Sequence, residues 1–262
     1  MKLSTIDVII PAIEKDLGTL PHVIDSVRRM VKHPIGKFMI IAPDTKRMRA
    51  LCARKNCAFV HENAVLPIAK KDIRYRSARW ERSGWLFQQL LKLGSDRLGA
   101  SKYYLVIDAD TVLIRPHAFR TPDGRTIFYY RNWSQPEYFR TYRKLMGGDP
   151  VSRKSFVTHY MLFDKEKVAH LKKTIEHRHK DRWYAAILKS MDLKRPFAFS
   201  EFETYGNFVA SRYPGSFEFR KALNVSLHTG VSGLTESKRK RLASSYRSVS
   251  LHKRKSYSRL PK

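Results

Sequence analysis

Short apolar runs alternate along the chain with longer stretches whose apolar residues recur at helical spacing. The apolar runs predict β-strands, which lie at residues 7–12, 38–44, 57–62, 103–107, 126–130, 156–163 and 197–199. The amphipathic stretches predict helices, which lie at residues 20–31, 80–93, 134–146, 165–179, 181–191 and 201–212. This alternation predicts an α/β fold with a mostly parallel central sheet that is flanked by helices on both faces.

The 262 residues suit one α/β domain, and we expect it to cover residues 1–235. Residues 236–262 are rich in Ser, Lys and Arg, and they predict a basic C-terminal tail that is flexible or forms an interface. Residues 237–262 hold ten basic side chains and no acid, which leaves +19 of the net +29 on the rest of the protein. The whole chain is therefore basic, and not the tail alone.

The composition of the chain indicates its cellular compartment and the kind of partner that it binds. No apolar run approaches the roughly 20 residues of a membrane span, and the two cysteines, Cys52 and Cys57, suit a reducing compartment. We therefore expect a cytoplasmic protein. A surface this basic attracts polyanions, and we expect docking to the anionic inner face of a membrane through the tail. Liposome binding that salt up to about 0.5 M leaves unchanged would contradict this expectation.

The most informative motif is Asp108-Ala109-Asp110, which follows the predicted buried strand 103–107 directly. In open α/β sheets, ligands bind at the carboxyl ends of the strands. Two carboxylates one residue apart can share a divalent cation that neutralises a diphosphate. The motif is followed by a second apolar run, which an aspartate pair in an ordinary surface turn would not normally have.

The motif and its neighbours together resemble the GT-A class of nucleotide-sugar glycosyltransferases and, more narrowly, a bacterial family of uncharacterised GT-A-like proteins. The resemblance extends over roughly residues 5–230 and rests on the order of several blocks, which lie at residues 8–12, 84–93, 104–111, 156–164 and 200–207. It implies a GT-A, Rossmann-like fold with the Asp-x-Asp at a strand end. It also implies a metal-dependent transfer from a nucleoside-diphosphate sugar to a polysaccharide or glycolipid acceptor.

The resemblance implies roles for individual residues. Asp108 and Asp110 are expected to bind Mn²⁺ or Mg²⁺, with His228 as the third ligand. The donor nucleotide-sugar is expected to contact Pro11, Ala12, Asp44, Arg82, Gln88, Gln89, Lys92 and Ala109. Asn132, Trp133 and His159 are expected in the acceptor or sugar pocket. Each position also has an ordinary explanation, such as a turn residue for Asp44 and His228, a solvated helix face for one of the two glutamines, and core packing for His159.

An inverting transferase also needs a base for the acceptor hydroxyl. Glu201 and Glu203 both lie at a predicted helix start, where Ser200 and Glu203 fit a capping box. The capping box favours a structural role for Glu203 and leaves Glu201 as the better base, although the two roles can be exchanged. A retaining enzyme would need neither.

Two other classes of protein fit parts of the sequence. Asp108 to Val112 matches the Asp-x-Asp-x-Thr/Val signature of haloacid-dehalogenase-type phosphatases, with Asp108 as nucleophile and Asp110 as acid/base. That family carries the motif on its first strand, whereas about a hundred residues precede it here. The charge also suits a nucleic-acid-binding protein, but the basic residues are dispersed and form no patterned motif. We therefore expect no specific nucleic acid partner.

Overall fold

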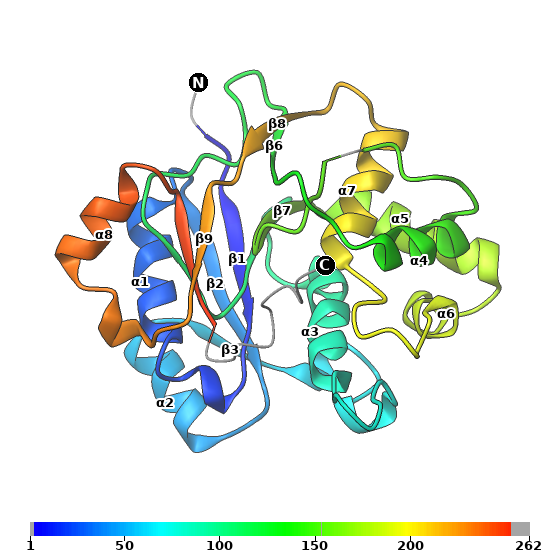
Figure 1. Ribbon diagram of the computed structural model, residues 1–262, viewed down its shortest axis with the longest axis horizontal. Helices are drawn as coiled ribbons and strands as arrows, with labels where there is room; N and C mark the ends of the chain where they lie inside the picture. Colours follow the sequence, from blue (N-terminus) through cyan, green and yellow to red (C-terminus); the bar gives the residue numbers. More distant parts are fainter. Residues whose placement is uncertain (1–2, 153, 253–262) are drawn as a thin grey trace.

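The computed structural model describes residues 3–152 and 154–252 (Figure 1). Its main sheet has the strand order β3-β2-β1-β4-β7, in which β1 to β4 run parallel and β7 runs antiparallel to β4. The strands of this sheet are β1 (Ile6–Pro11), β2 (Ile35–Ala42), β3 (Ala58–His61), β4 (Tyr103–Ile107) and β7 (Tyr160–Asp164). The predicted mostly parallel α/β sheet is therefore confirmed.

Helices cover both faces of this sheet, with α1 and α2 on one side and α3 to α7 on the other (Figure 1). The α-helices are α1 (Leu20–Met30), α2 (Lys46–Arg54), α3 (Ser83–Gly94), α4 (Pro136–Met146), α5 (Lys165–His179), α6 (Trp183–Ser190), α7 (Glu201–Arg212) and α8 (Glu236–Ala243). Short 3-10 turns lie at Glu14–Asp16, Glu62–Ala64, Lys70–Asp72, Ser95–Arg97 and Val231–Gly233.

The strands are buried on both faces, so each sends alternate side chains into two separate cores. Ile9 and Val106 belong to the core under α3, α5 and α7. Val8 and Leu105, which are their neighbours in sequence, belong to the core shared with α1 and α2. Continuous apolar runs at β1, β2 and β4 are the sequence signal of this two-sided burial.

A second sheet forms beside the first from short strands that are distant in sequence. Its order is β5 (Thr111–Leu113), β10 (Ser248–Leu251) and β9 (Asn224–Leu227), with β10 antiparallel to β5 and parallel to β9. The remaining pair is β6 (Thr126–Tyr130) with β8 (Phe217–Lys221), which run parallel. All four residues of β10 are buried, so the segment expected as a tail contributes a helix and a central strand through residue 251. Residues 253–262 lie outside the described residues.

Several element predictions were wrong in detail. The strand expected at 156–163 begins only at Tyr160, because the residues before it make a turn in which His159 has a positive φ of 70°. Residues 197–199 are not a strand, although Ala198 and Phe199 are buried. Helix α2 was missed because four of its nine residues are Lys or Arg, which mask its short buried face of Met48, Leu51 and Cys52.

Candidate active site

Antiparallel pairing places a histidine beside each aspartate of the motif. Strand β4 ends at Ile107 opposite Tyr160, the first residue of β7, so Asp108 and His159 are the next pair beyond the ladder. The Asp108 amide donates to the His159 carbonyl at 2.9 Å, and His159 Nδ1 lies 3.1 Å from Asp108 Oδ2. The left-handed backbone of His159, which is uncommon outside glycine, turns its ring towards the aspartate.

The second histidine comes from the end of β10. The Leu251 amide donates to the Asp110 carbonyl at 2.9 Å, which places the next residue, His252, beside the Asp110 side chain. His252 Nδ1 lies 3.3 Å from Asp110 Oδ2, and the His159 and His252 rings are 5.6 Å apart. The hydrogen bond that His252 donates to the Asp110 carboxylate raises the pKa of His252. The two aspartates and two histidines thus form one polar cluster, which we call the Asp-His cluster.

A buried lysine joins this cluster to the start of α7. Lys92 Nζ, on α3, lies 2.5 Å from Asp108 Oδ1 and 2.8 Å from Glu201 Oε1. The lysine and glutamate side chains are only 8% and 3% exposed, whereas that of Asp108 is 27% exposed. Although burial opposes it, the pairing with Asp108 and Glu201 raises the pKa of Lys92. Burial also works against the charge of Asp108, but Lys92 and His159 hold the pKa of Asp108 well below its usual range.

The two candidate bases have different surroundings. Burial raises the pKa of both Glu201 and Glu203. With its amide nitrogen turned towards α7, Gln89 donates to Glu201 Oε2 at 2.7 Å. Glu203 Oε1 instead accepts hydrogen bonds from Ser134, at 2.7 Å, and from Ser155.

Ser200 caps α7 as predicted, because the Glu203 amide donates to its hydroxyl at 3.2 Å. The Glu203 carboxylate, however, binds the two serines, which shows that the expected reciprocal half of the capping box was wrong.

The other predicted site residues are spread along the same edge and around it. Pro11 and Ala12 are buried where β1 ends, and Ala109 is buried between the aspartates. Asp44 is exposed beyond β2 and forms an ion pair with Arg49.

The remaining predicted residues lie on or before α3 and after β6. Gln88 is half-buried on α3, and Arg82, before that helix, lies over the Phe197 ring at 4.1 Å. Asn132 and Trp133 are exposed after β6.

His228 is exposed, just past the end of β9. The histidine that contacts Asp110 is His252, which the sequence analysis missed. The signal was present as the alternation of Val249, Leu251 and polar residues before it, but the basic composition of the segment concealed it. Ser134, Ser155 and Arg131, which surround Glu203, were missed as well.

The donor set fits a divalent cation in its chemistry, because carboxylate oxygens and imidazole nitrogens are ligands of Mn²⁺. Asp110 with His252, and Asp108 with His159, supply both kinds of donor. Within the described residues, no three His, Cys, Asp or Glu side chains already stand together as a cation site. Asp108 is instead neutralised by Lys92, so a cation there would share Asp108 with the lysine.

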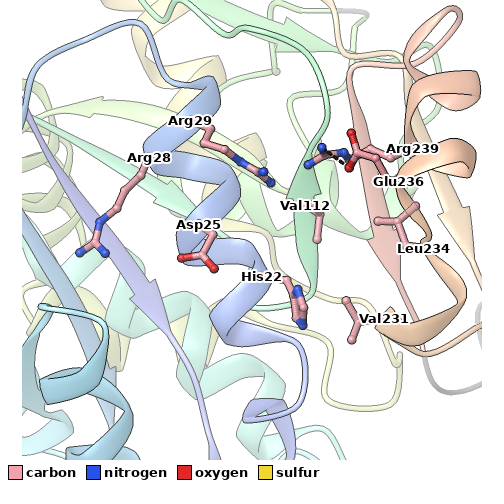
Figure 2. A pocket seen from close by; sticks show the side chains of 9 residues that line it. All are labelled: His22, Asp25, Arg28, Arg29, Val112, Val231, Leu234, Glu236 and Arg239. Atoms are coloured by element: carbon pink, nitrogen blue, oxygen red, sulfur yellow. Dashed lines mark hydrogen bonds and ion pairs between the residues drawn. The ribbon is translucent and has the colours of Figure 1, made fainter.

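Well-formed cavities occur away from this cluster. Figure 2 shows one of about 540 Å³ between α1, β5 and the segment that leads into α8. Its acids are already paired, Glu236 with Arg239 and Asp25 with Lys55. None of the predicted site residues lines it, and it gives no reason to move the candidate site from the Asp-His cluster.

In its overall structure the chain is similar to known glycosyltransferases. The galactosyltransferase LgtC, solved in complex with donor and acceptor sugar analogues, matches with a TM-score of 0.50 and 12% identity over 94% of this chain and 87% of that one. Mouse xyloside xylosyltransferase 1 in its apo form matches with a TM-score of 0.49 and 12% identity over 98% of this chain and 100% of that one. At 12% identity the likeness to LgtC concerns the fold alone, and it confirms the predicted GT-A architecture.

Sequence comparison is less informative about activity. No curated protein matches the sequence at a significant level. One family model matches residues 3–227, which include both aspartates, Lys92 and Glu201. Because this match spans most of the sequence, the chain belongs to DUF6492, a family of unknown function.

Proposed function

We propose that this protein is a metal-dependent glycosyltransferase that moves a sugar from a nucleoside-diphosphate sugar to a glycan or lipid-linked acceptor. The observation that carries the proposal is the convergence of Asp108, Asp110, His159 and His252 at the carboxyl end of β4, with Lys92 and Glu201 beside them. The GT-A fold supports it, and LgtC, with the same fold, was solved with donor and acceptor sugar analogues. Nothing in the comparisons supports the phosphatase alternative.

In this proposal, Asp108, Asp110 and His252 would hold Mn²⁺ or Mg²⁺, which when bound would supply Lewis-acid stabilisation to the leaving diphosphate. We assign the third position to His252 in place of His228, because His252 is the histidine that contacts Asp110. The histidine must be neutral to bind a metal, and its raised pKa means that protons compete at mildly acidic pH.

The residues of the protein itself position the reacting groups. The Lys92 ammonium fixes the carboxylates of Asp108 and Glu201 relative to each other. Glu201 is the better candidate for the base, because it pairs with Lys92, which also pairs with Asp108, and it accepts a hydrogen bond from Gln89. Glu203 is held by two hydroxyl donors and is better suited to shape the pocket.

The test is thermal unfolding of the purified protein with Mn²⁺ and UDP, GDP, CMP or dTDP in turn. A nucleotide at a hundred times its Kd stabilises the folded state by about 2.7 kcal/mol, and about 1 kcal/mol shifts the Tm of a protein of this size by roughly 2–4 °C. We therefore expect one nucleotide to raise the Tm by about 5–10 °C in a metal-dependent manner.

Two variants test whether the rise in Tm depends on the Asp-x-Asp motif. Asp110→Asn removes one carboxylate without changing the shape of the side chain, and we expect it to abolish the shift. Asp123→Asn is the matched control, because Asp123 is an exposed aspartate paired only locally with Arg125. A shift that survives in Asp110→Asn, or the absence of any shift in the wild type, would contradict the proposal.

A further inference from the structure

One arginine near the candidate site, Arg131, is neutralised only in part, through the electrostatic attraction of the buried Glu203. Arg131 follows β6, and its backbone is fixed by an antiparallel bridge to Ser155, with hydrogen bonds of 3.0 and 2.8 Å. No carboxylate of residues 3–152 or 154–252 forms an ion pair with its guanidinium, and Nε is buried without a hydrogen-bond partner among them. Burial lowers the pKa of Arg131, which nevertheless stays charged at neutral pH.

The acid that attracts it electrostatically, Glu203, is also held by hydrogen bonds from other groups. Glu203 Oε1 accepts hydrogen bonds from the hydroxyls of Ser134 and Ser155, and the Asn207 amide lies 3.5 Å from Oε2. The guanidinium itself lies over the ring of Trp133 at 4.7 Å. Its orientation is thus set by an aromatic face and a fixed backbone, while its hydrogen-bonding edge remains available to a ligand.

The position of Arg131 relates it to the Asp-His cluster. Ser155, to which its backbone is bridged, donates its hydroxyl to Glu203, two residues after Glu201 at the start of α7. Trp133, which is 38% exposed, presents an open aromatic surface next to the guanidinium. A cation and an aromatic ring in contact, with the exposed Asn132 between them in sequence, are therefore linked through Ser155 and Glu203 to the start of α7, which carries Glu201.

We propose that Arg131 binds an oxyanion, a phosphate or a carboxylate, that is carried by the acceptor, whose sugar ring packs on Trp133. The inference rests on the proposed transferase function, and it restricts the acceptor to an anionic class. A guanidinium matches the two oxygens of such a group with paired hydrogen bonds. The donor diphosphate is assigned to the metal position at Asp108 and Asp110, which leaves Arg131 for the second substrate.

The experiment measures the Tm against increasing inorganic phosphate or acetate at constant ionic strength, with and without saturating Mg²⁺–UDP. Arg131→Met removes the charge, Arg131→Lys keeps the charge without the planar fork, and Arg140→Met is the control. Arg140 is an exposed arginine on α4 that pairs only with Glu137 of the same helix.

We expect phosphate or acetate to raise the Tm of the wild type and of Arg140→Met equally. In Arg131→Met the apparent affinity should fall about tenfold to a hundredfold, which is the worth of hydrogen bonds to a charged group, and Arg131→Lys should lie between.

Three results would overturn the inference. The first is that neither anion raises the Tm of the wild type, and the second is that the anions raise the Tm of Arg131→Met as much as that of the wild type. The third is that Mg²⁺–UDP abolishes the rise in Tm by occupying the same place. The last result would assign Arg131 to the donor diphosphate. If none of the four nucleotides gives a shift in the wild type, the proposed function fails, while the anion response without nucleotide still decides the role of Arg131.

Discussion

Replacing Lys92 by methionine tests the electrostatic description of the site most directly. The change keeps a long unbranched side chain but leaves the buried carboxylates of Asp108 and Glu201 without their shared cation. At an effective dielectric constant of about 20, a contact near 2.8 Å is worth about 6 kcal/mol, which offsets the desolvation of each ion. Breaking a buried pair costs about 3–5 kcal/mol. Since Asp108 is 27% exposed and partly screened by water, we expect a loss at the lower end, about 3 kcal/mol.

The assay is urea unfolding from pH 4 to pH 9. The folded-state pKa of Asp108 is depressed, so its contribution to stability is present above the ordinary value near 4 and is lost as the pH falls through the lower folded value. The pKa of Lys92 is raised, so its contribution disappears only in strong alkali. The difference between wild type and Lys92→Met should therefore be constant near neutrality and shrink in acid, where the variant protonates its stranded carboxylates.

Two controls separate this network from ordinary ion pairs. Lys102→Met removes an exposed lysine that pairs with Glu166 at 2.9 Å, and it should cost no more than about 1 kcal/mol. Adding Glu201→Gln to Lys92→Met should recover part of the loss, because one stranded charge is removed. The reasoning is refuted if Lys92→Met is as mild as Lys102→Met, or if its cost is the same at every pH.

Three further predictions concern other parts of the molecule. Burial lowers the pKa of His117 to about 3, so the unfolded chain binds more protons below pH 6.5 and stability should fall in that range by up to about 1.4 kcal/mol per pH unit. This slope, measured by urea unfolding, should be smaller in His117→Phe. Gly206→Ala should lower the Tm by overpacking, since the new Cβ would lie 2.3 Å from the Phe156 ring, whereas Gly148→Ala, which meets nothing within 4 Å, should not. Binding to anionic liposomes in sedimentation assays should weaken steeply with salt, and salt-independent binding would exclude electrostatic docking.

The parts of the fold that local sequence predicts are the long periodic ones. Strands β1, β2 and β4 are apolar on both faces and end at Pro11, Ala42 and Ile107, so their type and approximate bounds follow from the pattern alone. The same pattern places Asp108 and Asp110 at the carboxyl edge of the sheet. The positions of Lys92 and Gln89 are predicted as well, because the apolar residues of α3 pack on the sheet and leave these polar side chains to face its carboxyl edge.

The histidine partners could not be predicted in the same way. Strand β10 is only four residues long and pairs with β5, more than a hundred residues earlier, so the alternation of Val249 and Leu251 with polar residues indicates a short strand but not its partner. Its neighbourhood is dominated by Lys and Arg, which are typical of a tail. His228 was the expected ligand because it follows a recognisable strand. The ladder between β9 and β10 instead brings His252 to Asp110, and only the pairing register decides between the two.

The basic C-terminal segment is therefore also a part of the candidate site. The segment beyond residue 235 is basic, yet it supplies β10, which is central in the second sheet, and it carries His252 to Asp110. A shift of one residue in the β10 register would turn alternate side chains to the opposite face and would remove His252 from the aspartate. The buried side chains of Val249 and Leu251 fix this register, so the contact between His252 and Asp110 depends on them. An anionic partner that binds this basic segment would contact residues that are close in sequence to His252, the proposed metal ligand. Binding of the partner would therefore act directly on the candidate active site.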